Sequence, residues 1–141
     1  MQLDATLLRD SFTLVLDRRP DLTMRFYEIL FERYPALAPL FSRAREAQAQ
    51  MLGQAIGAVL DHLDNAPWLS NTLGTLGRKH TGYGVTDEMY DQVGDVLVAT
   101  LAETAAEAWT PRLAAQWTAA YGVIASLMKA GAAAEASGRW C

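Results

Sequence analysis

The 141-residue sequence has one cysteine, two histidines and no long uncharged apolar run. Because the cysteine is the last residue, Cys141, we expect no internal disulfide and no zinc site built from several thiolates. A membrane-spanning helix needs about 18 or more apolar residues, and the apolar stretch 51–60 is already interrupted by Gln54. The N-terminus also lacks the basic and apolar regions of a signal peptide. We therefore expect a cytoplasmic protein without a membrane span.

Positive charge is also in short supply. The chain carries 12 Lys and Arg against 16 Asp and Glu, a net charge of −4, and its pI is near 5.1. Nucleic-acid-binding domains usually present a basic surface, so we expect no nucleic-acid partner. The 51% of hydrophobic residues indicates one folded domain over residues 1–141. A mean hydropathy of +0.03 is high for such a domain, so some apolar surface needs a further explanation.

The spacing of the apolar residues predicts helices throughout. They recur with a period near 3.6, and β-branched residues never alternate with polar ones as they do in strands. We therefore expect an all-α domain, with a flexible tail of small residues from about residue 131. The expected helical segments are 3–16, 20–34, a short turn at 35–41, 45–63, 68–81, 87–106 and 111–129.

Two polar side chains fall on apolar helix faces. At 100° per residue, Gln48 begins a stripe that otherwise holds only apolar side chains. An inward amide either sits at the mouth of the core or bonds to a group inside it. Tyr27 lies on the apolar face of its helix, where a core tyrosine usually finds a partner for its hydroxyl. The stripe of Gln48 continues with Leu52, Ala55, Ile56, Val59 and Leu63.

The two histidines allow different interpretations. His62 lies near a helix end and fits an ordinary half-buried position. His80 ends another expected helix, where a cation interacts favourably with the helix dipole. A single histidine cannot build a zinc site, but one imidazole beside a large apolar slot is enough to hold haem iron.

The order of these features resembles the globin family, and most closely its single-domain bacterial members and the haem domain of flavohaemoglobins. The resemblance covers residues 3–130 and implies an all-α globin fold, a three-over-three helical sandwich around haem b. Five segments carry it: Arg25-Phe26-Tyr27-Glu28, Tyr34-Pro35-Ala36-Leu37-Ala38-Pro39-Leu40-Phe41, Leu76-Gly77-Arg78-Lys79-His80 with Tyr83-Gly84-Val85, Tyr90 with Val93-Gly94, and Ala120-Tyr121-Gly122-Val123.

On the proximal side, the resemblance implies that His80 is the iron ligand. Its other ring nitrogen is then expected to bond to a backbone carbonyl one turn earlier, near Leu76. Val85, Tyr90 and Val93 are expected to line this side of the cofactor. Tyr90 also matches the flavohaemoglobin tyrosine that supports the proximal histidine.

On the distal side, the resemblance places Tyr27 and Gln48 opposite bound oxygen, with Leu52 above the iron. Phe41 matches the aromatic residue that wedges the haem in place. A hydroxyl and an amide that both donate hydrogen bonds to bound oxygen slow its release, by about tenfold for each 1.4 kcal/mol. The resemblance therefore implies high oxygen affinity.

The implied function is reversible oxygen binding, with nitric oxide detoxification by dioxygenation to nitrate as the chemistry. The expected ligands are oxygen, nitric oxide and carbon monoxide. Flavohaemoglobins continue into a reductase that this sequence does not contain, so turnover requires an external reductase and the classification as an enzyme stays open. A gas sensor acting through a partner protein is the alternative. A haem-free globin fold is a third interpretation, and both monomer and homodimer fit.

One family feature has no certain counterpart. Flavohaemoglobins use a C-terminal glutamate, together with the tyrosine matched by Tyr90, to charge the proximal histidine. The aligned position is Ala134, and Glu135 follows it in an alanine-rich tail that does not fix the register. Without that carboxylate, peroxidase-like activity is expected to be modest.

Overall fold

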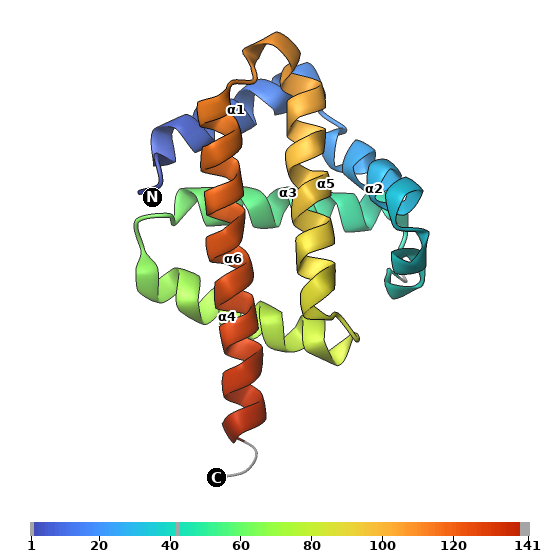
Figure 1. Cartoon of the computed structure of the whole chain (residues 1–141), viewed down its shortest axis with the longest axis vertical. Coiled ribbons are helices and arrows are strands. Elements are labelled where there is room, and N and C mark those ends of the chain that lie inside the picture. Colours follow the sequence, from blue (N-terminus) through green and yellow to red (C-terminus); the bar gives the residue numbers. More distant parts are fainter. Residues whose placement is uncertain (1, 42, 139–141) are drawn as a thin grey trace.

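The computed structural model describes residues 2–41 and 43–138, with side chains up to 133. Its described part consists of α-helices and two short 3₁₀ segments, without strands (Figure 1). The all-α prediction is therefore confirmed. The elements are α1 (Ala5–Arg18), α2 (Leu22–Arg33), η1 (Pro35–Leu40), α3 (Arg45–Asp61), α4 (Ala66–Gly82), α5 (Asp87–Ala105), η2 (Ala106–Ala108) and α6 (Pro111–Gly138). None of the helices in this part is long and apolar enough to cross a membrane.

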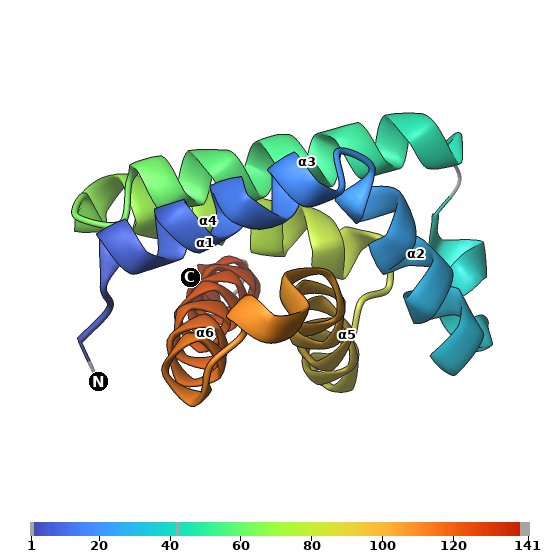
Figure 2. The same cartoon turned by 90° about the horizontal axis from the view of Figure 1, so that it is seen from above.

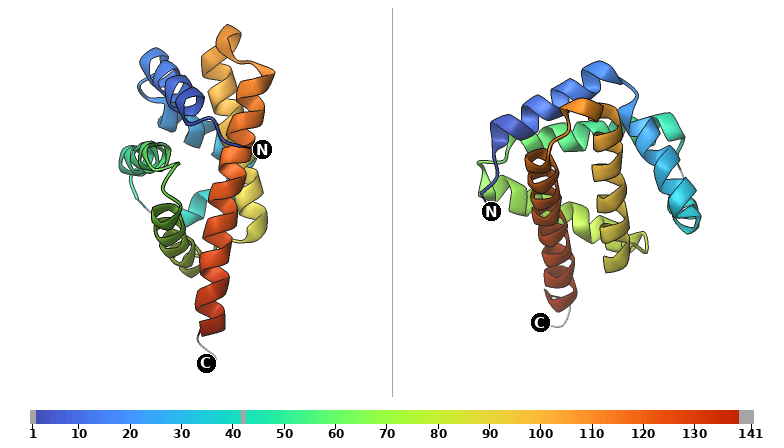
Figure 3. Two further views of the ribbon diagram at one scale, coloured as in Figure 1. Left: turned by 90° about the vertical axis from the view of Figure 1, so that its left-hand side faces the viewer. Right: turned by 45° about the horizontal axis from the view of Figure 1, so that its top comes forward.

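The helices form two layers. Seen from above, α1, α3 and α4 lie in one layer, and α2, α5 and α6 lie in the other (Figure 2). Helices α3 and α4 run across the direction of α5 and α6, and the same crossing is visible from two further sides (Figure 3). This is the expected three-over-three arrangement.

Local signals in the sequence explain where the helices begin and end. The Asp4 carboxylate accepts a hydrogen bond from the Leu7 amide at 3.0 Å and caps α1. The Asn65 side chain caps α4 in the same way through the Trp68 amide. After α4 the chain turns at Gly84, whose φ of 87° favours glycine. Most predicted helix limits agree with the structure to within two residues.

The end of the last helix differs from the prediction. Helix α6 continues to Gly138 instead of stopping near Lys129. Alanine has the highest helix propensity, so the alanine-rich segment extends the helix although it offers few side chains to pack. Ala134, the position aligned to the family glutamate, and Glu135, the candidate for a proximal carboxylate, lie on this extension, where side chains are outside the described part. All of Cys141 also lies outside it.

Helices α4 and α6 approach each other very closely. A Cβ atom added to Gly77 would collide with the backbone of Met128. One added to Gly131 would collide with the backbone of Gly74. The absence of side chains at these glycines lets the two helix backbones touch, so α6 sets the position of α4.

The core is divided into two clusters of buried side chains. The larger one joins α1, α2, α3, α5 and the first half of α6, with Leu8, Leu30 and Val96 fully buried at its centre. The smaller one lies mainly between α4, α5 and α6 and includes Leu73 and Tyr90. The partly buried Leu63 and Tyr121 pack against both clusters.

The inward stripe of α3 is rotated slightly from the prediction. Val59 is buried and Ile56 half-buried as expected, but Ala55 is exposed, so that part of the prediction is wrong. Ala49 and Leu60 are buried instead. The cause is the packing of α3 against α1 and α2, which favours the side of the helix that faces those two neighbours.

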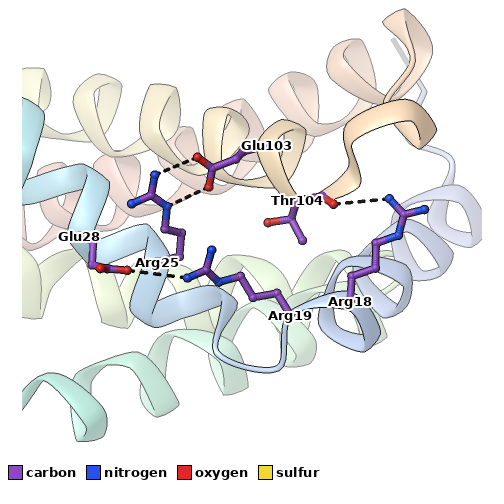
Figure 4. A pocket seen from close by; sticks show the side chains of 6 residues that line it. All are labelled: Arg18, Arg19, Arg25, Glu28, Glu103 and Thr104. Carbon is purple, nitrogen blue, oxygen red and sulfur yellow. Dashed lines mark hydrogen bonds and ion pairs between the residues drawn. The ribbon is translucent and has the colours of Figure 1, made fainter.

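A polar hollow of about 400 Å³ lies beside α2 and α5 (Figure 4). Arg25 reaches across it and makes two hydrogen bonds of 2.8 Å to the Glu103 carboxylate. Arg19 lies 3.9 Å from the Glu28 carboxylate, and Arg18 donates to the Ala105 carbonyl at 2.6 Å. Each of these three guanidinium groups has an acceptor within the protein. The side chains around the hollow therefore form a network of ion pairs and hydrogen bonds that links helices.

Candidate functional site

A cavity of about 220 Å³ opens between α2, η1 and the start of α3. Tyr27, Phe41 and Gln48, which the sequence resemblance placed on the distal side, all line it. The structure therefore brings these three predicted site residues together. The full lining is Tyr27, Phe31, Ala38, Phe41, Arg43, Arg45 and Gln48.

Aromatic rings form the inner wall of this cavity. The ring centroid of Tyr27 lies 5.4 Å from that of Phe41 and 5.8 Å from that of Phe31. Phe31 and Phe41 are themselves 5.4 Å apart. Such tilted and edge-on pairs are favourable arrangements of aromatic rings. Helix α2 supplies Tyr27 and Phe31 one turn apart, and the 3₁₀ turn brings Phe41 against them.

Tyr27 is the buried polar group of the cavity, with 3% of its surface exposed. Burial raises the pKa of its hydroxyl, and a hydrogen bond with the Gln48 side chain partly opposes this shift. The hydroxyl is therefore protonated at neutral pH and can donate a hydrogen bond. Gln48 is half-buried, so it lies at the cavity mouth and also bonds to a group inside.

His80 lies in the last turn of α4. Its Nδ1 atom is 2.8 Å from the backbone carbonyl of Leu76, the hydrogen bond expected from the sequence. Because a carbonyl only accepts, Nδ1 carries a proton, and in the neutral form of the ring Nε2 then has the lone pair. Tyr83, whose side chain is exposed, has its ring centroid 6.4 Å from the His80 ring.

His62 makes the same kind of bond in a different setting. Its Nδ1 is 2.7 Å from the carbonyl of Ala58, but its ring is stacked flat on Trp68 with centroids 3.8 Å apart. The stacking places His62 in the α3–α4 connection. The two histidines thus share a tautomer and differ in what their rings face.

Most other predicted cofactor contacts do not line the cavity at Tyr27. Apolar side chains on inner faces are usually buried, yet those predicted to line the cofactor keep accessible surface, with the exception of Tyr90. The half-buried ones are Phe41, Leu52, Leu76, Val85 and Val93, and His80 is half-buried as well. An apolar lining with accessible surface is what a large flat cofactor requires.

Tyr90 is buried in the smaller cluster. Burial and the negative charge of Asp87 raise the pKa of its hydroxyl. Its backbone carbonyl accepts a hydrogen bond of 2.6 Å from the Tyr121 hydroxyl, and the Lys129 ammonium lies 5.4 Å from the centre of its ring. Leu76 and Val85 pack against the same cluster, so three predicted proximal residues meet there.

Three lining residues were not singled out as site residues in the sequence. Phe31 lies one turn after Tyr27 in the sequence, where an aromatic side chain on an apolar helix face is typical of a core. Arg43 and Arg45 follow an irregular segment, where spacing does not tell in which direction a side chain points. The feature of the sequence that could have indicated them is their position a few residues before Gln48, which was itself predicted to be in the site.

No group of three His, Cys, Asp or Glu side chains in the described ranges could hold a metal ion. A metal at His80 would therefore need most of its ligands from a cofactor. The sequence model of the globin family matches residues 24–128. The chain belongs to the globin family.

Among curated proteins, this globin is 32% identical over 124 residues to the flavohemoprotein of Vibrio cholerae, covering 86% of the chain and 32% of that protein. It is 34% identical over 110 residues to the flavohemoprotein of Bordetella pertussis, covering 76% of the chain and 27% of that protein. The chain thus spans about a third of the length of these relatives.

Solved structures agree with the family assignment. A bacterial globin from Campylobacter jejuni has a TM-score of 0.79 at 23% identity, covering 94% of this chain and 96% of the other. An engineered carbene transferase from Rhodothermus marinus has a TM-score of 0.82 at 25% identity, covering 96% and 97%. The flavohemoglobin of Malassezia yamatoensis, solved with bound FAD and heme, has a TM-score of 0.75 at 23% identity and covers 94% and 36%.

Proposed function

We propose that this globin binds haem b, with His80 as the proximal ligand, and retains oxygen tightly. The observation that carries the proposal is the pairing of Tyr27 with Gln48 at a cavity lined by aromatic rings. The flavohemoprotein relatives and the heme-containing Malassezia yamatoensis structure support the choice of cofactor.

The residues present fit haem in two respects. The Leu76 carbonyl orients His80 so that Nε2 has a lone pair for iron. The half-buried Leu52, Leu76 and Val85 offer apolar surface to a flat ring. Phe41, held against Tyr27 and Phe31, would press on the same ring from the distal side.

Bound haem supplies an iron that takes up diatomic gases and passes electron density to oxygen. The task of the chain is to stabilise that charge and exclude water. The Tyr27 hydroxyl and the Gln48 amide can both donate hydrogen bonds, which are stronger beside buried aromatic rings than in water. Two such donors favour retention of oxygen over its delivery.

Tight retention of oxygen suits the dioxygenation of nitric oxide, in which the bound oxygen is consumed. Nitric oxide, oxygen and one electron combine to give nitrate, so each turnover requires an electron from a reductase. The Rhodothermus marinus protein, provisionally described as a nitric oxide dioxygenase, supports this choice. We propose that a reductase supplies this electron to the globin.

Absorption spectra of the purified protein with added haem test the binding. We expect a sharp Soret band and a stable oxygenated form. His80→Gly should lose the normal spectrum and regain it with added imidazole. His62→Gly is the matched control, because it also loses a histidine whose Nδ1 bonds to a carbonyl four residues earlier. A normal spectrum in the His80 variant would refute the assignment.

Stopped-flow mixing of the oxygenated protein with nitric oxide tests the reaction. We expect stoichiometric nitrate and the ferric protein within milliseconds. Slow reaction, or release of oxygen without nitrate, would leave oxygen retention as the function and reject dioxygenation.

A further inference from the structure

Two arginines stand at the cavity that holds Tyr27 and Gln48. Arg43 and Arg45 both line this cavity, and both are exposed to solvent. They come from the segment that leads into α3 and from the first residue of that helix. The cavity mouth therefore carries two positive charges that the proposed oxygen chemistry does not use.

Neither guanidinium group has an ion pair within the part of the chain that the structure describes. Arg43 Nη1 contacts the Sδ atom of Met51 at 2.6 Å, and Arg45 lies over the Phe31 ring at 5.1 Å from its centroid. Sulfur and an aromatic face leave the positive charge largely uncompensated. In the polar hollow of Figure 4, by contrast, Arg25 is fully paired with Glu103.

The surroundings increase the positive potential at the mouth. Helix α3 starts at Arg45, and its N-cap residue Ala44 provides no side-chain cap, so the positive end of the helix dipole also faces this region. Glu46 follows in the first turn but is exposed. Deeper in the cavity, Tyr27 and Gln48 add two donors, and none of the lining residues is acidic.

We propose that Arg43 and Arg45 make this cavity mouth a binding site for small inorganic oxyanions such as nitrite and nitrate. A planar guanidinium group matches two oxygens of such an anion. A cavity of about 220 Å³ has room for about seven waters at about 30 Å³ each, and therefore for a small anion such as nitrate. The arginines thereby favour anionic ligands and retain nitrate as it leaves. This inference rests on the proposed function for the position of the iron.

Ligand-binding kinetics of the haem-loaded full chain test the site. The anionic probe is nitrite with the ferric protein, and the neutral probe is carbon monoxide with the ferrous protein. In the double variant Arg43→Gln, Arg45→Gln, we expect nitrite association to slow at least fivefold and carbon monoxide association to change less than twofold. The salt dependence of nitrite association should weaken as well.

Arg33→Gln is the matched control. Arg33 is exposed at the end of α2 and does not line the cavity, so its removal tests the effect of losing one positive charge elsewhere on the surface, against the two lost in the double variant. We expect both rates to stay within twofold of the unmodified protein. An equal loss in the control and the double variant would show a general effect of charge and overturn the site.

A titration with sodium nitrate, followed by ¹⁵N NMR of the arginine side chains and the Gln48 amide, gives a readout without haem. We expect saturable shifts that the double variant lacks. Shifts without haem but none with it would mean that the carboxylates of the cofactor occupy both arginines, and would overturn the proposal. Failure to take up haem, by contrast, would reject the proposed function while this titration still reports on the anion site.

Discussion

Tyr27 combines two properties that rarely occur together in one side chain. It is almost fully buried, and its hydroxyl is shared with Gln48 at a cavity instead of being satisfied inside the core. The raised pKa keeps the hydroxyl protonated over the whole physiological range. Its capacity to donate a hydrogen bond to a ligand is therefore independent of pH near neutrality.

Replacing Tyr27 by Phe tests this role directly. The ring remains against Phe31 and Phe41, and only the donor is lost. We expect the oxygen dissociation rate to rise at least tenfold, which corresponds to about 1.4 kcal/mol. Stopped-flow displacement of oxygen by carbon monoxide measures it, and a rate within twofold of the original would remove Tyr27 from the role.

Single residues could be predicted where local geometry decides. The bond from His80 to the Leu76 carbonyl, which the resemblance implies, spans one turn of helix, and it is present. Arg43 and Arg45 could not be assigned in this way, because Arg43 precedes the helix and only the path of the chain brings both to the cavity. Ala55 is exposed because of the way α3 is rotated against α1 and α2. This rotation cannot be predicted from the sequence of α3 alone.

At the scale of elements, the helix that carries His80 is positioned by glycines. Gly74 and Gly77 allow the backbone of α4 to touch that of α6 at Met128 and Gly131. Gly57 on α3 is the opposite case, since a Cβ there would meet nothing within 4 Å. Two glycines in helix interiors thus have different effects on stability.

Alanine substitutions should therefore have opposite signs at the two positions. Gly57→Ala should raise the free energy of unfolding by about 0.5–1 kcal/mol, because alanine restricts the unfolded chain and favours a helix. Gly77→Ala should lower it by about 1–3 kcal/mol, because the added atom forces α4 and α6 apart. Urea denaturation followed by circular dichroism measures both, and equal effects would contradict the packing explanation.

Helix limits were predictable to the extent that caps and glycines mark them. Asp4, Asn65 and Gly84 lie where helices begin or end. The end of α6 was missed because Gly131, two residues after the predicted end, lies inside this helix instead of ending it, and the alanines that follow continue the helix. The close approach of Gly131 to Gly74 holds this part of α6 against α4, and it could not be predicted because it is visible only in three dimensions.

At the scale of the whole molecule, ion pairs join elements that are distant in sequence. Asp4 at the start of α1 bonds to Arg112 on α6 at 2.8 Å. Glu103 on α5 holds Arg25 on α2, and Glu107 bonds to Arg18 on α1 at 2.6 Å. Hydrogen bonds lower the pKa of all three carboxyl groups. The donors to Asp4 are the Leu7 amide and then Arg112. The donor to Glu103 is Arg25, and the donor to Glu107 is Arg18.

These lowered pKa values predict a loss of stability in acid. The folded protein binds fewer protons at these groups than the unfolded chain, so their contribution is complete above the unfolded pKa values, near 4. It is lost as the pH falls through the lower folded values. The urea midpoint of unfolding should decrease from pH 7 to pH 5 and pH 3. In Glu103→Gln, the midpoint should decrease less steeply with falling pH. An unchanged slope in that variant would exclude the Glu103 pair as a source.

The contact between α4 and α6 also limits how this chain can evolve. Positions 77 and 131 tolerate no side chain without movement of a whole helix, so drift there requires coordinated change on both helices. A sequence comparison across close relatives should find small residues varying together at these positions. An engineer who wishes to shift His80 relative to the rest of the molecule can do so from α6, by enlarging residue 131, without altering any residue that faces the site.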